Sequence, residues 1–198
     1  MIESTLIVGK QLSFMKKADM GFNKDQILLL DMNNEVNKKF EVLRTEWLRN
    51  KFIIGVTASG QRIGNNFNGW GFKVKLDIGI YHFTPSNVNV DYDYLKVYGI
   101  KLKEGRDFSR DFPTDKGRAF IINETMVHEL DMKEPIGTPA GHAWYENDSL
   151  GTVIGVARDF NYNSFHHKIG MLALVCHPEW GYDEISIKID GIHIQEAI

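Results

Sequence analysis

Two short apolar runs, separated by an amphipathic segment, constrain the fold of this chain most strongly. Residues 26–32 read Gln-Ile-Leu-Leu-Leu-Asp-Met, residues 52–58 read Phe-Ile-Ile-Gly-Val-Thr-Ala, and each run is typical of a buried β-strand. The residues between them place apolar side chains at helical spacing, and these are Val36, Phe40, Leu43 and Trp47. A strand, a helix and a strand within about 35 residues predict a βαβ or split βαβ unit.

The middle of the chain predicts a second and more mixed region. Residues 59–71 are rich in glycine, asparagine and serine, which indicates a hinge or a subdomain boundary. Residues 72–80 alternate apolar and polar side chains, which predicts a strand with one wet face. We expect Asp91 to cap a short helix and Asn123 to cap another that runs to Met132.

Four more apolar segments predict strands, and they are residues 118–122, 152–157, 171–176 and 185–189. The elements are mixed in order rather than strictly alternating, and the chain has no internal repeat. This pattern predicts an α+β fold.

Composition and charge exclude several classes of protein. The chain has 198 residues, 43% hydrophobic and 25% charged, as expected for a globular chain with its own core. The net charge is -3 with acids and bases interspersed, so we expect no nucleic-acid partner. No apolar window reaches the roughly 20 residues that span a bilayer. The single cysteine, Cys176, excludes an internal disulfide and is interpreted as a small buried hydrophobe.

No motif predicts catalysis or a bound metal. The serines lie outside any Gly-x-Ser-x-Gly elbow, and the glycine-rich residues 60–69 lack the pattern of a phosphate-binding loop. The histidines have no zinc-site spacing, and they are His82, His128, His142, His166, His167, His177 and His193. We therefore expect no catalytic residue, no cofactor and no metal.

Charged side chains of both signs gather in one segment, and they are Arg106, Asp107, Arg110, Asp111 and Asp115. The aspartates could form a carboxylate site. The preferred interpretation is a solvated loop with local ion pairs, because this is the more common arrangement of such residues.

Aromatic residues in or beside loops leave two interpretations open. They are Trp70, Phe72, Tyr81, Phe83, Trp144, Tyr145, Trp180 and Tyr182. Aromatic side chains are enriched at partner interfaces. They also cover the ends of a core, and this second interpretation is the one that we favour.

Six short phrases occur in a fixed order along the chain. They are Gln11-Leu-Ser-Phe-Met, Asp19-Met-Gly-Phe-Asn-Lys-Asp-Gln-Ile-Leu, Gly105-Arg-Asp-Phe, Ile122-Asn-Glu, Pro135-Ile-Gly and Val153-Ile-Gly-Val-Ala-Arg-Asp-Phe. Together they resemble the extracytoplasmic (MacB-like periplasmic core) domain of an ABC transporter permease of the MacB/FtsX kind, in particular the Bacteroidetes type. The chain departs from the pattern at Met171, where that family leads us to expect a proline.

The resemblance implies an α+β fold with two subdomains. A porter-like split βαβ subdomain would comprise residues 1–65 and 160–198. A small inserted α/β (Sabre-like) subdomain would comprise residues 66–159. The boundaries rest on the turn-rich residues 59–71 and on the irregular stretch near residues 158–163.

The resemblance also implies a function without chemistry of its own. The domain would transmit ATP-driven movement of transmembrane helices to the periplasmic side, for export or release of a substrate. Its partners would be a second permease copy, a cytoplasmic ABC ATPase and a periplasmic adaptor. Flanking transmembrane helices, absent from this chain, would hold the domain on the periplasmic face of the inner membrane. Phe14, Met15 and Phe22 would then form the membrane-proximal interface.

The loop aromatics motivate an alternative, a periplasmic ligand-binding or sensor module, which predicts a concave pocket with convergent polar groups. A hydrolase would need a nucleophile beside a base, and no motif in the sequence indicates such a pair.

Overall fold

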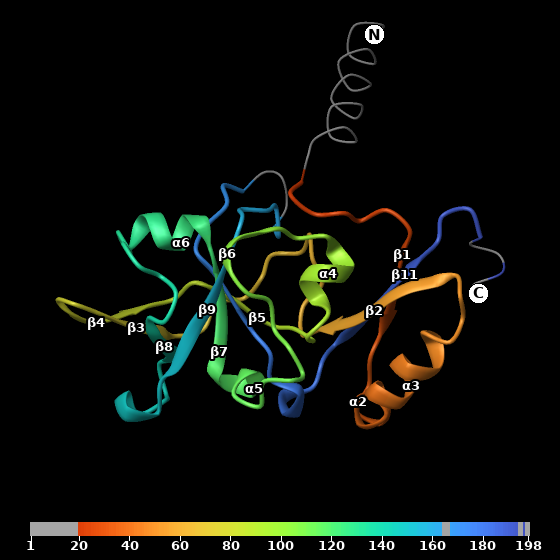
Figure 1. The fold of residues 1–198 in the computed structure, drawn as a ribbon, viewed down its shortest axis with the longest axis horizontal. Coiled ribbons are helices and arrows are strands. Elements are labelled where there is room, and N and C mark those ends of the chain that lie inside the picture. The colour runs from red at the N-terminus through yellow and green to blue at the C-terminus, as the bar shows by residue number, and fades with distance from the viewer. Residues whose placement is uncertain (1–19, 164–166, 194–195, 197–198) are drawn as a thin grey trace, which may run out of the picture.

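The computed structural model describes residues 20–163, 167–193 and 196, which form two β-sheets with short helices around them (Figure 1). The first sheet has the order β1-β11-β2, with strands β1 (Ile27–Asp31), β2 (Ile53–Ser59) and β11 (Glu184–Ile189). Because β11 is antiparallel to both neighbours, β1 and β2 are parallel to each other. Helices α2 (Asn34–Lys38) and α3 (Phe40–Trp47) connect them, so this unit is a split βαβ.

Two features of this unit differ from the sequence-based expectation. The single helix expected around Val36 to Trp47 is two helices, because Lys39 between them leaves the helical region, with φ -110° and ψ 5°. The strand β1 lies at the edge of the sheet and is only partly buried, so the expectation of a buried strand is wrong for it. Phe40 is buried against Tyr182, with ring centroids 5.6 Å apart.

The second sheet contains eight strands, in the order β4-β3-β8-β9-β7-β10-β5 with β6 paired to β9. Its strands are β3 (Phe72–Leu76), β4 (Gly79–Phe83), β5 (Ser86–Asn89), β6 (Leu102–Gly105), β7 (Ala119–Asn123), β8 (Pro139–His142), β9 (Gly151–Ala157) and β10 (Leu172–Val175). The pairs β7–β9 and β5–β10 are parallel, and the others are antiparallel. A mixed sheet with a few short helices confirms the α+β class.

The expected long strand over residues 72–80 is instead a hairpin, β3 followed by β4. Gly79 has a φ of +138° just after the turn, and Ile78 at the tip is 83% exposed. The expected wet face is also wrong at Lys73, which is buried. Its ammonium group donates hydrogen bonds to the carbonyl of Tyr145 and to Oδ1 of Asn147 at 2.8 Å.

Short helices and turns complete the fold: α4 (Tyr94–Tyr98), α5 (Asp115–Arg118), α6 (Glu124–Glu129) and the 3-10 turns η1 (Asn147–Ser149) and η2 (Pro178–Trp180). Asn123 caps α6 as expected, but the helix ends before Met132. Within the described part of the chain, no helix is long and apolar enough to cross a membrane.

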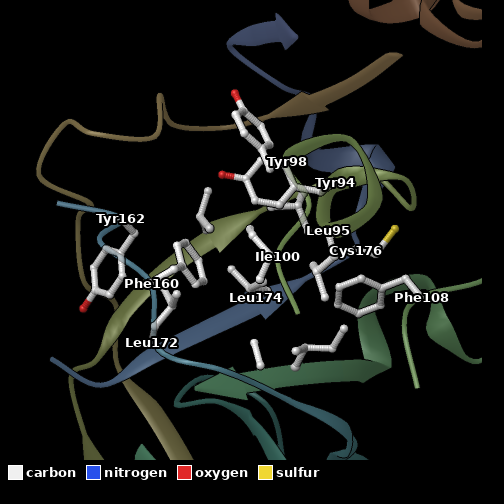
Figure 2. Packing of buried hydrophobic residues seen from close by; sticks show 14 of the residues in the cluster. Tyr94, Leu95, Tyr98, Ile100, Phe108, Phe160, Tyr162, Leu172, Leu174 and Cys176 are labelled. Atoms are coloured by element: carbon white, nitrogen blue, oxygen red, sulfur yellow. The ribbon is translucent and has the colours of Figure 1, made fainter. Parts of the chain in front are cut away.

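The second sheet is covered on both faces. On one face, side chains from α4 share a cluster with Leu172 and Leu174 of β10, part of which Figure 2 shows. On the other, Met126 of α6 packs in a cluster with Phe72 and Phe120. Full burial of a side chain of this size contributes about 2 kcal/mol relative to exposure, so these clusters dominate the stability.

The two sheets meet where β2 ends. The amide of Asp91 donates to the carbonyl of Ala58 at 2.8 Å, and Ser59 forms a β-bridge with Val90. The strands of the second sheet run from residue 72 to residue 175, so β10 lies beyond the expected return at residue 160. The subdomain boundaries stay a prediction, because sheet membership alone does not define a subdomain.

Candidate functional site

The structure places Phe22 at the junction of the two sheets, whereas Phe14 and Met15 lie outside the described residues. Phe22 is half-buried and packs against the largest core cluster. Its ring lies edge-on to Tyr98, at 6.0 Å between centroids, and to Phe160, at 6.3 Å. It therefore contacts both α4 and the segment that follows β9.

The residues around Phe22 are also held through the backbone. We call residues 20–23 the lead-in segment. The amide of Asn23 donates to the carbonyl of Tyr98 at 2.6 Å, and the carbonyl of Met20 accepts from the amide of Asn161 at 2.8 Å. The segment then continues into β1 of the first sheet (Figure 1). It is thus attached to parts of both sheets.

Gly21 allows this close approach. Its φ is +74°, and a Cβ added there would lie 2.8 Å from the carbonyl oxygen of Asp159 and 2.8 Å from Cβ of Phe160. Any side chain would push the lead-in segment away from the second sheet.

An apolar groove of about 390 Å³ opens beside Phe22. Its walls come from the lead-in segment, β1, α4 and the turn after β2, and its apolar lining residues are Met20, Phe22, Ile27, Leu29, Ile63 and Tyr98. The polar residues that also line it are Lys24, Asn161 and Asn163. The lining is mainly apolar, so the groove suits the packing of apolar groups.

Asp159, next to the lead-in segment, organises the start of α6. Its carboxylate accepts hydrogen bonds from the Asn123 amide group at 2.8 Å and from the backbone and hydroxyl of Thr125 at 3.0 and 2.7 Å. Its own amide donates to Glu124 Oε2 at 3.1 Å. Two of the sequence phrases, one ending in Asn123-Glu124 and one in Asp159-Phe160, therefore meet in one structural cluster.

The charged segment after β6 is less solvated than expected. Arg106 forms a bidentate ion pair with Asp115, at 2.6 and 2.7 Å, and the Asp115 side chain is fully buried. Burial raises the pKa of Asp107 to about 6. The expectation of local ion pairs is confirmed, and the expectation of a solvated loop is wrong for these two carboxylates.

A second ion cluster joins the helix of the first sheet to the second sheet. Arg110 contacts Asp91 at 2.9 Å and Asp93 at 2.7 Å, and it lies 3.4 Å from Glu41 of α3. Arg44 of α3 also pairs with Asp93. The expectation that Asp91 caps α4 is wrong, because Asp93 occupies the N-cap position and Asp91 is a buried ion-pair partner.

Burial raises the pKa of Asp91 to about 6, although Arg110 lowers it. The pKa of Asp93 is below its ordinary value because Arg110 and Arg44 outweigh its partial burial. Asp91 is thus a buried carboxylate that is paired with Arg110, and Asp93 shares this cation with it.

Two observations on the described part of the molecule concern a metal site and the single cysteine. No three histidine, cysteine, aspartate or glutamate side chains among those residues lie close enough together to hold a metal ion. Cys176 is fully buried, and burial raises the pKa of its thiol far above the ordinary range, so it remains protonated.

The loop aromatics divide between the two interpretations. Phe72 and Tyr182 are buried in the core, as favoured. Trp70, Trp144 and Trp180 remain 38%, 58% and 39% exposed and lie close together. No sequence pattern indicated that these three would meet, because they come from separate segments.

Comparison with known proteins gives a match in structure but not in sequence. No protein-family model and no curated protein matches the chain. The periplasmic region of MacB from Actinobacillus actinomycetemcomitans is similar, with a TM-score of 0.57, 14% identity, and coverage of 89% of this chain and 82% of that one. The extracellular domain of the ABC-type transporter YknZ from Gram-positive bacteria has a TM-score of 0.53, 15% identity, and coverage of 85% and 86%.

A domain of a permease protein from Porphyromonas gingivalis is also similar, with a TM-score of 0.51 and 12% identity, over 72% of this chain and 64% of that one. At such identities the likeness concerns the fold. The chain has the fold of the extracytoplasmic domains of MacB/FtsX-like ABC transporter permeases.

Proposed function

We propose that this chain is the extracytoplasmic domain of an ABC transporter permease, and that it transmits ATP-driven movement of transmembrane helices to the periplasmic side. The observation that carries the proposal is the attachment of the lead-in segment to both sheets. Hydrogen bonds at Met20 and Asn23, and the ring of Phe22, connect it to α4 and to the segment after β9. A displacement at residue 20 would therefore move the domain as one body.

In this proposal the domain is not an enzyme. It works with a second permease copy, a cytoplasmic ABC ATPase and a periplasmic adaptor, and transmembrane helices outside this chain place it on the periplasmic face of the inner membrane. Phe14 and Met15 would extend the membrane-proximal interface from Phe22 toward the membrane. Domains of this fold in the periplasmic region of MacB and the extracellular part of YknZ support this setting.

We also propose that the domain has two subdomains, a porter-like one of residues 1–65 and 160–198 and an inserted one of residues 66–159. The split βαβ unit of β1, β2 and β11 lies within the first of these ranges, and the strands from β3 to β9 lie within the second. The ion cluster of Arg110, Asp91 and Asp93 with Arg44 and Glu41 of α3 supports a stiff junction between them.

The test is the substitution Phe22→Ala in the whole transporter, with ATP hydrolysis and substrate export measured side by side. The truncation removes the ring contacts to Tyr98 and Phe160 but leaves the ATPase subunits untouched. We expect hydrolysis to continue and export to fall, which is the signature of uncoupling.

The matched control is Leu102→Ala, because Leu102 is also partly buried against the same cluster but lies outside the lead-in segment. We expect this variant to lose a similar amount of packing and to retain export. Equal export by both variants and by the unmodified transporter would refute the proposal.

The groove beside Phe22 favours a second candidate, a periplasmic ligand-binding or sensor module. Its volume of about 390 Å³ and its apolar lining suit a small amphiphile. A rise in melting temperature with long-chain amphiphiles, removed by Ile63→Trp, which would fill the groove, supports this candidate. An unchanged melting temperature across such ligands would eliminate it.

A further inference from the structure

Three of the four tryptophans of this chain form an exposed cluster at one end of the second sheet. We call Trp70, Trp144 and Trp180 the tryptophan cluster. Trp70 precedes β3, Trp144 follows β8, and Trp180 lies in η2, so the fold assembles them from three separate segments. Each is between 38% and 58% exposed. Exposed apolar rings gathered in this way mark interaction sites.

The rings are inclined to one another rather than coplanar. Their centroids are 5.9 Å apart for Trp70 and Trp180, 6.4 Å for Trp70 and Trp144, and 6.3 Å for Trp144 and Trp180. The angles between the ring planes are 72°, 55° and 50° respectively. Inclined neighbouring rings do not form one flat stacking surface, which is the surface that a flat ring would need.

Histidines hold two of the rings in place. His142 stacks on Trp144 at 4.5 Å and 3°, and His177 stacks on Trp180 at 4.2 Å and 10°. His142 is fully buried, and neither ring nitrogen has a partner among the described residues. Burial lowers its pKa to about 4, so the base of the cluster is uncharged at neutral pH. A preformed and uncharged surface loses little entropy on binding.

The tryptophan cluster offers hydrogen-bond donors. None of the three indole N–H groups forms a hydrogen bond with another described residue. Indole is a donor only. A hollow of about 190 Å³ beside Trp70 and Trp180 adds the exposed side chains of Asn68 and Asp183. Asp183 supplies a carboxylate at the edge of the cluster.

We propose that the tryptophan cluster binds an extended, proline-rich segment of a partner protein with a basic residue beside the prolines. A polyproline II segment presents a narrow ridge and carbonyl acceptors, and its prolines have no backbone N–H to satisfy. These properties complement inclined rings that carry free donors. Positions two residues apart on such a helix are about 6 Å apart, close to the spacing of the rings. The basic residue pairs with Asp183.

The location suits contact with another protein. Lys116 of α5 pairs with Glu179 of η2 at 2.6 Å, which places α5 beside the cluster. In Figure 1, α5 lies at the lower edge of the view and the segment of residues 20–26 at the upper edge. The element α5, beside the cluster, therefore lies at the opposite edge of this view from residues 20–26.

The test is a titration of this chain with an acetylated hexaproline peptide that ends in arginine, followed by tryptophan fluorescence. We expect a saturable change, and we expect Trp144→Ala and Trp180→Ala each to weaken binding by about tenfold or more. Trp144→Phe, which keeps a ring but removes the N–H donor, is expected to give a smaller loss. Circular dichroism checks that each variant folds. We expect the Trp144 variants to fold, because the Trp144 side chain is largely exposed.

The controls separate the proposed ligand from other occupants. Ile78→Ala, at an exposed apolar residue far along the β3–β4 hairpin, should bind the peptide unchanged. A glycine–serine peptide of equal length ending in arginine, and a chitin oligosaccharide, should give no response. The proposal fails if the proline peptide gives no saturable change or if the tryptophan variants bind it normally. It also fails if either control ligand binds with the same dependence on tryptophan.

Discussion

Arg110 is the cation that offsets the charge of the buried Asp91 carboxylate. Its removal should show how much the stability of the contact between the two sheets depends on this ion pair. The two groups are 2.9 Å apart, and the Asp91 side chain is 1% exposed. We expect Arg110→Ala to lower the free energy of unfolding by about 2 kcal/mol at neutral pH, below the usual loss for a buried pair because Arg110 itself is partly exposed. Urea denaturation measures this change.

The same variant should show a defined pH dependence. The folded-state pKa of Asp91, about 6, lies above its unfolded value, so Asp91 stabilises the fold at low pH and this contribution is lost as pH rises through about 6. Without Arg110 the pKa rises further, so the loss of stability should be larger at about pH 8 than at about pH 5. Arg49→Ala removes an exposed ion pair and is the control, with no measurable change expected. An equal loss at both pH values would contradict a buried, titrating Asp91.

His142 should make the fold sensitive to acid. Burial lowers its folded pKa to about 4, whereas its unfolded value is about 6.5. Its contribution is therefore fully present above about pH 6.5 and is lost as pH falls toward about 4. Relative to His142→Phe, the unmodified chain should lose up to about 3 kcal/mol over this range. Parallel stability curves for the two proteins would show that His142 titrates normally.

At the scale of elements, two asparagine caps should differ because their surroundings differ. Asn33 caps α2 at an exposed position, with Oδ1 accepting from Val36 N at 2.9 Å. Asn123 caps α6 while buried, and it also accepts from Leu172 N at 2.9 Å and donates to the carbonyl of Gly170 at 2.9 Å. We expect Asn33→Ala to cost about 1 kcal/mol. Asn123→Ala should cost about 3 kcal/mol, because buried groups lose their partners.

Chemical denaturation of both variants tests this difference. Asn123 connects α6, β10 and the segment around Asp159, so its loss should also be visible as faster amide exchange in β10. Similar costs for the two variants would show that Asn123 acts only as a helix cap.

The elements were largely predictable from local patterns, and the exceptions have local causes. Short apolar runs predicted β7, β9, β10 and β11, because strands inside a sheet that is covered on both faces need apolar side chains on both faces. A similar run predicted β2, which lies at the edge of the first sheet. The alternation over residues 72–80 could not reveal the turn at Ile78, because apolar residues recur at every second position on both sides of it. In the structure Ile80 pairs with Lys75 and so lies on the other face from Val74 and Leu76. The sequence could not predict the burial of Lys73 either, because the acceptors of its ammonium group belong to residues 145 and 147, far along the chain.

At the scale of the whole molecule, the resemblance of the six short phrases to MacB/FtsX-like permease domains predicted the fold, but it did not predict the tryptophan cluster. The phrases containing Gly105, Asn123 and Asp159 are structural, because they form turns, caps and ion pairs around the core. The position of Phe22 at the junction could be predicted only from its place in a phrase. The tryptophan cluster could not be predicted, since it depends on how three loops converge.

In the function that we propose, the domain moves as one stiff body when the transporter binds ATP. Ile78 is 83% exposed at the tip of the β3–β4 hairpin, and Cys176 is fully buried, so Ile78→Cys provides the accessible thiol for a spin label within the described part of the domain. The measurement is the distance between labels on two permease copies by electron–electron double resonance, with cysteines elsewhere in the permease replaced. We expect a non-hydrolysable ATP analogue to shift this distance, and Phe22→Ala to reduce the shift. An identical distance distribution with and without the nucleotide would contradict the account.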